Sequence, residues 1–204
     1  DTVTIGMDDI LRGVGSKQIT LTSTADPIIR IQVDDDQNNH FGDWHKTAII
    51  ENLILEGNGS NQGILLQDVY NCLIRNVTIK NCDTGVKLTA TTGKFSEANS
   101  IEHVRMMDVN KGIVFEKGDG TGSFAFTHIS DVGISLKDLA DKTGIIIGEG
   151  CEPYSSFIKA NVWMTQNCAG MDVHGKTKLG LINLHVQKSG VRGGTGVHIL
   201  SPYE

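Results

Sequence analysis

The sequence predicts an all-β fold, a right-handed parallel β-helix of about seven coils, in which short strands stack on those of the next coil. A short unit recurs along the chain at steps of 22 to 33 residues. Each copy alternates apolar and polar residues, which is typical of strands. Repeats of this length indicate a solenoid, because one unit cannot bury its apolar face without a neighbour.

The clearest copy of the unit spans residues 74–88 and reads IRNVTIKNCDTGVKL. In its first half, Val77 and Ile79 flank Thr78, and its second half shows the same alternation. The period of two and the β-branched residues predict two short strands. The Asn, Asp and Gly residues between these strands predict turns.

Asn or His recurs at the bend that opens the first strand of each copy. Both residues are enriched in the left-handed backbone region, so we expect a corner there whose stacked Asn side chains hydrogen bond. These positions are Asn52, Asn76, His103, His128, Asn161 and Asn183. A glycine begins each second strand, and we expect it to form a second corner. The glycines are Gly63, Gly85, Gly112, Gly144, Gly170 and Gly196.

Residues that point outward from the second strands fall in one predicted column. Its members are Arg30, Leu65, Lys87, Val114, Ile146, Asp172 and His198. The apolar members are unusual on a solvated face, so we expect a loop or a neighbouring subunit to cover them. On the first strands, Glu51, Arg75 and Glu102 are expected to form a ladder of exposed ion pairs, worth about 0.2–1 kcal/mol each.

The chain of 204 residues suffices for one domain, and residues 1–204 are interpreted as a single β-helix domain. No capping element is evident at either end, so we expect a fragment of a longer chain or an oligomer that protects its ends. The net charge of −6 argues against a nucleic-acid partner. No apolar run is long enough to cross a bilayer, so no membrane partner is expected.

The four cysteines are expected to be free. They are Cys72, Cys82, Cys151 and Cys168, and they lack the spacing of a metal site. Cys82 and Cys168 lie in similar turns three coils apart, about 14 Å at about 4.8 Å per coil, which is too far for a disulfide. We therefore expect buried cysteines that behave as small apolar residues.

The segment 34–45, DDDQNNHFGDWH, is a polar stretch rich in carboxylates. Its carboxylates are Asp34, Asp35, Asp36 and Asp43, which could hold calcium. Their spacing matches no known calcium loop, so a solvated turn is the favoured interpretation. The sequence requires no other cofactor.

On these repeats, which cover nearly the whole chain, the sequence resembles the pectin-lyase-like superfamily of right-handed parallel β-helices. That superfamily includes pectate lyases, polygalacturonases, and the trimeric tailspikes and appendages of phages. The resemblance implies that saccharides lie over the outward face of the strand at 85–88. It is a resemblance of repeat pattern, so it supports the fold far more than an activity.

The first candidate site, proposed as catalytic, comprises Lys87, Asp83, Asp108 and Glu116, with Asn110 on an adjoining turn. A lysine beside carboxylates resembles the base-plus-calcium arrangement of some polysaccharide lyases. The carboxylates would hold the metal, and the lysine would take the proton alpha to a uronate. A surface ion pair between Lys87 and Glu116 is the alternative.

The second candidate site, proposed for binding, comprises Asp172, His174 and His198. His198 lies one coil from Asp172, about 4.8 Å along the stack, so the two could form an acid/base pair or hold a divalent metal. Trp163 points outward from a first strand and could stack on a sugar ring or pack under a loop.

The catalytic motifs of the superfamily are absent. The polygalacturonase set of NTD, DD, GHG and RIK does not occur as a set, and neither do the pectate lyase patterns vWiDH and RxPxxR. We therefore expect a module that contacts polysaccharide without catalysis, in an extracellular protein or on a virion or cell surface. A homotrimer or further coils of a longer chain would complete it. The alternatives are a lyase or glycoside hydrolase acting on acidic polysaccharide, and a spacer that binds nothing.

Overall fold

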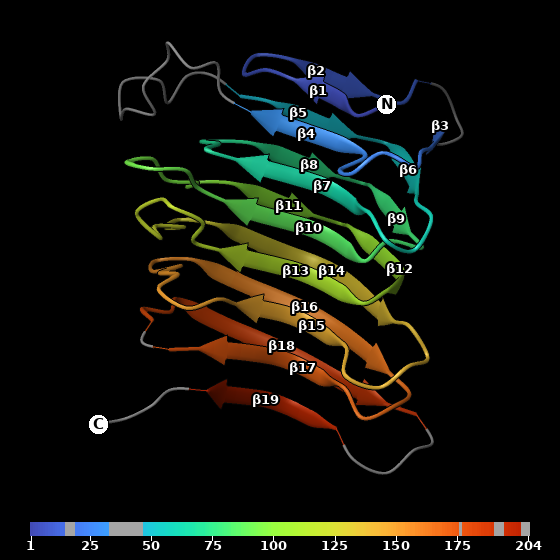
Figure 1. The fold of residues 1–204 in the computed structure, drawn as a ribbon, viewed down its shortest axis with the longest axis vertical. Helices are drawn as coiled ribbons and strands as arrows, with labels where there is room; N and C mark the ends of the chain where they lie inside the picture. Colours follow the sequence, from blue (N-terminus) through green and yellow to red (C-terminus); the bar gives the residue numbers. More distant parts are fainter. Residues whose placement is uncertain (15–18, 33–46, 176, 190–193, 201–204) are drawn as a thin grey trace.

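The computed structural model describes residues 1–14, 19–32, 47–175, 177–189 and 194–200. The protein is an all-β parallel solenoid of about six turns, which confirms the predicted fold class. Its strands stack along the long axis from the N-terminal end to the C-terminal end (Figure 1).

The strands form two sheets, and they pair in parallel. The first sheet has eight strands, in the order β1 (Val3–Ile5), β4 (Ile29–Gln32), β7 (Gln62–Gln67), β10 (Thr84–Thr89), β13 (Lys111–Glu116), β15 (Thr143–Ile147), β17 (Ala169–His174) and β19 (Thr195–Leu200).

The second sheet has eleven strands and branches at β14. One path runs through β2 (Ile10–Arg12), β5 (Ile49–Glu51), β8 (Leu73–Arg75), β11 (Ser100–Glu102) and β14 (His128–Leu136). From β14 a second path returns through β12 (Arg105–Val109), β9 (Thr78–Lys80), β6 (Leu53–Glu56) and β3 (Ile19–Thr22). β14 also pairs with β16 (Phe157–Met164), which pairs with β18 (Leu181–Lys188).

The core lies between the two sheets and is built from inward-facing residues of their strands. Val77 and Ile79 are buried, whereas Thr78 between them is partly exposed. Val86 and Leu88 are buried in the same way on the facing sheet. The buried apolar residues form one continuous cluster, so the alternation in the sequence follows burial.

The predicted left-handed corner is confirmed in three turns. Asn52, Asn76 and His103 have φ angles of 60°, 53° and 53°. The side-chain amide of Asn76 donates to Oδ1 of Asn52 at 3.4 Å. The predicted hydrogen bond between stacked Asn side chains therefore forms between these two turns.

The corner prediction is wrong for His128, Asn161 and Asn183, which lie inside β14, β16 and β18. Ser130 is the register partner of Glu102, so the corner of this turn falls at Asp131, with a φ of 52°. β16 and β18 pair in an unbroken register instead of bending. Continuous pairing satisfies their backbone N–H and C=O groups, and this outweighs the turn preference of Asn.

The column of glycines exists, but it is not a column of left-handed corners. Left-handed glycines of the described chain lie elsewhere, at Gly59, Gly93, Gly118, Gly122, Gly150, Gly175 and Gly194. A Cβ on any of the column glycines except Gly196 would meet neighbouring atoms at close range. A Cβ on Gly112 would lie 2.4 Å from the carbonyl oxygen of Gly144 and 2.7 Å from Ile134. Position 112 is therefore glycine because no space remains for a side chain.

The charged ladder on the second sheet is more buried than predicted. Glu51 is only 3% exposed and accepts hydrogen bonds from Arg12 and Arg75. Nη2 of Arg75 lies 2.6 Å from Oε2 of Glu51. The bond from Arg75 outweighs the effect of burial and lowers the pKa of Glu51. Three successive turns are thus joined through one buried carboxylate.

All four cysteines are free and buried, as predicted. Burial raises the pKa of Cys82 to about 11 and that of Cys151 to about 12, so these thiols stay protonated at neutral pH. Among the described residues, no helix has the length and apolar character needed to span a bilayer.

Replacing Gly112 with alanine should lower the free energy of unfolding by about 1–3 kcal/mol, because the new methyl group would press on a backbone oxygen. Gly196 is the matched control: it lies in the same column, and a Cβ there meets nothing within 4 Å. Urea unfolding followed by circular dichroism measures both variants. Equal stability of Gly112→Ala and Gly196→Ala would show that the sheets have room to spare at position 112.

Candidate functional site

The predicted outward column is confirmed by the strand register of the eight-stranded sheet. Its members are consecutive partners from Arg30 through Leu65, Lys87, Val114, Ile146 and Asp172 to His198. Leu65 and Val114 are only 6% and 8% exposed. Leu65 is flanked by the long side chains of Arg30 and Lys87, whose stems can cover it. The burial of Leu65 and Val114 therefore needs no second subunit.

The first candidate group is divided by the geometry of the strands. Nζ of Lys87 lies 2.8 Å from Oε2 of Glu116, so these two side chains form an ion pair. Asp83 stands just before β10, four residues from Lys87, which is about 13 Å along an extended strand. Asp108 is exposed, with a φ of 55°, where the register of β12 and β14 shifts. The four residues do not meet at one point.

Asp83 belongs to its own closed hydrogen-bonded group. Its Oδ1 accepts from the amide of Asn110 at 2.8 Å, and its Oδ2 accepts from Thr84 at 3.1 Å and from Lys111 at 3.4 Å. Burial acts to raise the pKa of Asp83, but the donors, Asn110 first, outweigh it and lower the pKa. The ammonium of Lys111 takes the place that a metal ion would need beside this carboxylate.

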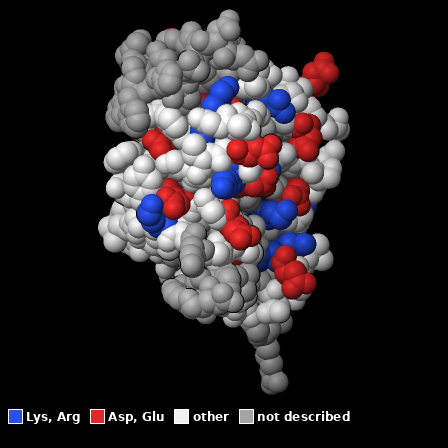
Figure 2. All heavy atoms as spheres, turned by 60° about the vertical axis from the view of Figure 1, so that its left-hand side comes forward, with Lys and Arg blue, Asp and Glu red and all other residues white. Residues whose placement is uncertain are grey.

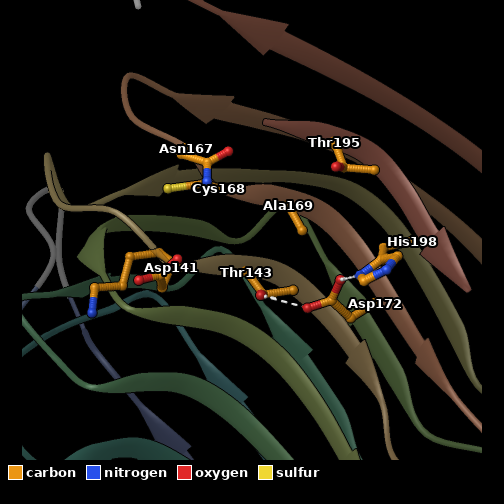
Figure 3. A pocket seen from close by; sticks show the side chains of 9 residues that line it. Asp141, Thr143, Asn167, Cys168, Ala169, Asp172, Thr195 and His198 are labelled. Atoms are coloured by element: carbon orange, nitrogen blue, oxygen red, sulfur yellow. Dashed lines mark hydrogen bonds and ion pairs between the residues drawn. The ribbon is translucent and has the colours of Figure 1, made fainter. Parts of the chain in front are cut away.

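The second candidate group is brought together in part. Nδ1 of His198 lies 3.5 Å from Oδ1 of Asp172, and Oγ1 of Thr143 donates to Oδ2 of Asp172 at 2.9 Å (Figure 3). His174 lies two residues further along β17 and does not line the same pocket. Trp163 lies on β16 in the other sheet, 41% exposed, and donates from Nε1 to Gln187.

A pocket of about 340 Å³ opens beside Asp172 (Figure 3). It is lined by Asp141, Lys142, Thr143, Asn167, Cys168, Ala169, Asp172, Thr195 and His198. In the row of residues that begin successive strands, Ala169 pairs with Thr143 on one side and Thr195 on the other. The small side chain of Ala169 between two larger ones leaves space at this point of the row.

Oδ1 of Asp172 is buried and accepts no hydrogen bond. The side chain is 17% exposed overall, and that of His198 is 51% exposed. Since Oδ1 is buried, the exposed part belongs to the rest of the Asp172 side chain. The pocket therefore combines an accessible imidazole with a partly exposed carboxylate, which can only accept hydrogen bonds when it is ionised.

Sequence reasoning found Asp172 and His198 but missed Thr143, Asn167 and Ala169. The outward column contains the first two, because they alternate with buried residues. The other three lie in or next to the turns that precede the strands, where the sequence shows only polar and small residues. The signal that could have found them is the row of strand-starting residues, in which Ala169 is the smallest member.

Calcium finds no support in the part of the chain that the structure describes. Within those residues, no group of three or more His, Cys, Asp or Glu side chains is arranged to hold a metal ion. The carboxylates Asp34, Asp35, Asp36 and Asp43 lie outside the described residues.

Figure 2 shows acidic and basic side chains interspersed over one face of the molecule. The described chain has ion pairs between turns, such as Lys178 with Glu152 at 3.0 Å and Lys159 with Asp131 at 3.2 Å. Paired charges of this kind contribute little to stability individually.

No protein-family model matches the chain, and no curated protein matches it. A function therefore has to be argued from the chemistry of the site.

Glu97 is a buried acid outside the pocket. It is 4% exposed and accepts a hydrogen bond from Ser123. Burial raises the pKa of Glu97 above its ordinary value of 4.5, and the bond from Ser123 offsets this only in part. The folded protein thus holds this proton more tightly than the unfolded chain does. The stabilising contribution is complete below the unfolded pKa and is lost as the pH rises through the folded pKa.

Glu97→Gln should therefore raise the melting temperature at pH 7, by about 2–4 °C, which corresponds to about 1 kcal/mol for a chain of this size. The gain should shrink at pH 4, where Glu97 is mostly protonated in both states. Thermal unfolding at both pH values measures this, with Glu102→Gln, on a partly exposed strand residue, as the control. A variant that is less stable at pH 7 would contradict the argument.

Proposed function

We propose that the protein is a non-catalytic β-solenoid domain that binds carbohydrate in the pocket beside Asp172. The observation that carries the proposal is the partly exposed carboxylate of Asp172 in a pocket whose lining is mostly polar. The lining adds hydroxyl groups from Thr143 and Thr195 and an amide from Asn167. Sugars present many donors and acceptors close together, so they suit a small pocket with such a lining.

The volume of the pocket indicates that it binds only a small part of a ligand. A volume of about 340 Å³ is at the low end of the range for small-molecule sites, about 300–1,000 Å³. A pocket of this size suits a ring-sized group at the end or along the side of a longer chain. The remainder of a polysaccharide would lie over the outward column of the same sheet.

We also propose that the solenoid is right-handed and belongs to the pectin-lyase-like superfamily. The left-handed corners at Asn52, Asn76 and His103 and the regular outward column support this assignment. Connections between parallel strands of one sheet are right-handed in about 98% of cases, which favours the same hand here.

We place the domain in an extracellular protein or on a virion or cell surface, as part of a homotrimer or of a longer chain. The location follows from the resemblance to surface and phage proteins alone. The support for the assembly comes from β18, whose inward residues Ile182, Leu184 and Val186 are only half-buried. A neighbouring subunit or a further coil would bury them. Light scattering that shows a strict monomer at high concentration would contradict the trimer.

A second function, polysaccharide cleavage, is favoured by one specific observation. Asp172 and His198 lie 3.5 Å apart, and a second carboxylate, that of Asp141, lines the same pocket. A carboxylate and an imidazole can act as base and acid in a lyase, and two carboxylates can serve a glycoside hydrolase.

The binding proposal predicts that Ala169→Leu abolishes the retention of glycans, because the larger side chain would fill the pocket. Lys111→Leu is the control, since Lys111 lies in the same row of strand starts and does not line the pocket. A glycan array followed by calorimetry on any retained oligosaccharide measures both. Equal retention by the two variants would place binding elsewhere, and an array that retains nothing would favour a spacer.

The cleavage alternative predicts turnover of uronate-containing or neutral polysaccharides, followed as unsaturated products and as new reducing ends, with and without calcium. His198→Gln should then lower kcat by at least about a hundredfold, as expected for loss of a general acid or base. No turnover across the panel, with binding retained, would support the non-catalytic function.

A further inference from the structure

The carboxylate of Asp172 constrains the chemistry of the ligand. One oxygen accepts from Thr143 at 2.9 Å. The other, Oδ1, is buried and lies 3.5 Å from Nδ1 of His198, so a ligand meets the remaining, exposed part of the side chain. Because an ionised carboxylate can only accept, a ligand that hydrogen bonds to Asp172 must bring an O–H or N–H donor.

The pocket has two other charged groups, one acidic and one basic. Asp141 adds a second carboxylate to the lining. Lys142 also lines the pocket and forms no ion pair within the described residues, so it is the one permanent cation there. A ligand carboxylate that approached Asp172 would bring no hydrogen-bond donor and would be repelled by a like charge at short range.

We propose that the pocket selects a neutral sugar residue, whose hydroxyl groups donate to Asp172, over a uronate. This inference rests on the proposed carbohydrate binding and deepens it by naming the class of sugar. Adjacent hydroxyl groups on a sugar ring can both donate to one carboxylate, and Thr195 and Asn167 can bind the oxygens next to them. The imidazole of His198 lies beside the carboxylate of Asp172 (Figure 3).

The test compares neutral and uronate-containing oligosaccharides by calorimetry on the full chain. The probes are the neutral glycans retained on the array and galacturonate oligomers of the same length. We expect the neutral ligands to bind at least about tenfold more tightly. Asp172→Asn, which replaces one acceptor oxygen with a donating amide, should weaken them by about ten- to a hundredfold, as for the loss of a hydrogen bond to a charged group. It should not weaken the binding of the uronates.

Lys142→Met separates the contribution of the cation. It should reduce whatever affinity the wild-type protein has for galacturonate oligomers, because Lys142 is the group that can pair with their carboxylates. Circular dichroism and the melting temperature of each variant exclude loss of the fold. Lys111→Leu outside the pocket controls for a change in net charge.

The outcomes distinguish the two proposals. Tight binding of galacturonate oligomers that Ala169→Leu abolishes would leave carbohydrate binding standing and overturn the selection for neutral sugars. Retention of no glycan at all, neutral or acidic, would overturn the proposed function and with it this inference. Neutral binding that Asp172→Asn leaves unchanged would show that Asp172 is not the acceptor.

Discussion

The solenoid depends on how closely the backbone of one coil approaches the next coil and the facing sheet at the column of glycines. A Cβ on Gly85 would lie 2.5 Å from Sδ of Met106 on the facing sheet, and one on Gly170 would lie 2.5 Å from the carbonyl oxygen of Gly196. These contacts fix how the inner faces pack, and they repeat from turn to turn. Each glycine also precedes an outward residue by two positions, so Gly170 sets the place of Asp172 and Gly196 that of His198. The packing inside thus determines the spacing of the site outside.

The stack places buried carboxyl groups in two different electrostatic environments. Glu51 lies between two arginines from the turns on either side, which keep it ionised. Glu97 is equally buried, but Ser123 gives it only a hydroxyl partner, so its neutral form is favoured. Burial in the stack therefore accompanies a lowered pKa for Glu51 in β5 and a raised pKa for Glu97 in the loop before β11. The difference arises from which residues occupy the neighbouring turns.

The sequence predicted the features that depend on period-two alternation, and it failed where pairing overrode a local preference. Val77 and Ile79 reveal their strand because alternation and burial coincide, and the column through Asp172 follows from the same pattern. Asn161 looks like a corner residue, but it lies in β16, where its side chain contacts His185 across the ladder at 3.2 Å. A preference for the left-handed region is weaker than the hydrogen bonds of a continuous strand.

Only two residues of the candidate site, Asp172 and His198, could be predicted, because they point outward and alternate with residues that face inward. The pocket around them depends on turns, whose path is set by contacts between coils that no local pattern encodes. Ala169 illustrates this, because an alanine at the start of a strand has no significance until its partners, Thr143 and Thr195, are known. The grouping of Asp83 with Lys87 failed for the opposite reason. The two residues are close in sequence, but an extended strand keeps them apart.

Asp83 and Asp172 both lie on the eight-stranded side of the solenoid, and their hydrogen bonding decides which of them can bind a ligand. Both oxygens of Asp83 already accept from side chains of the protein, including the ammonium of Lys111. Asp172 accepts a hydrogen bond from Thr143 on one oxygen, and part of its side chain is exposed in the pocket. A ligand at Asp83 would have to replace existing hydrogen bonds, whereas a ligand at Asp172 can bind the exposed part of the carboxylate without replacing one. This difference, more than the presence of a carboxylate, makes Asp172 the better site.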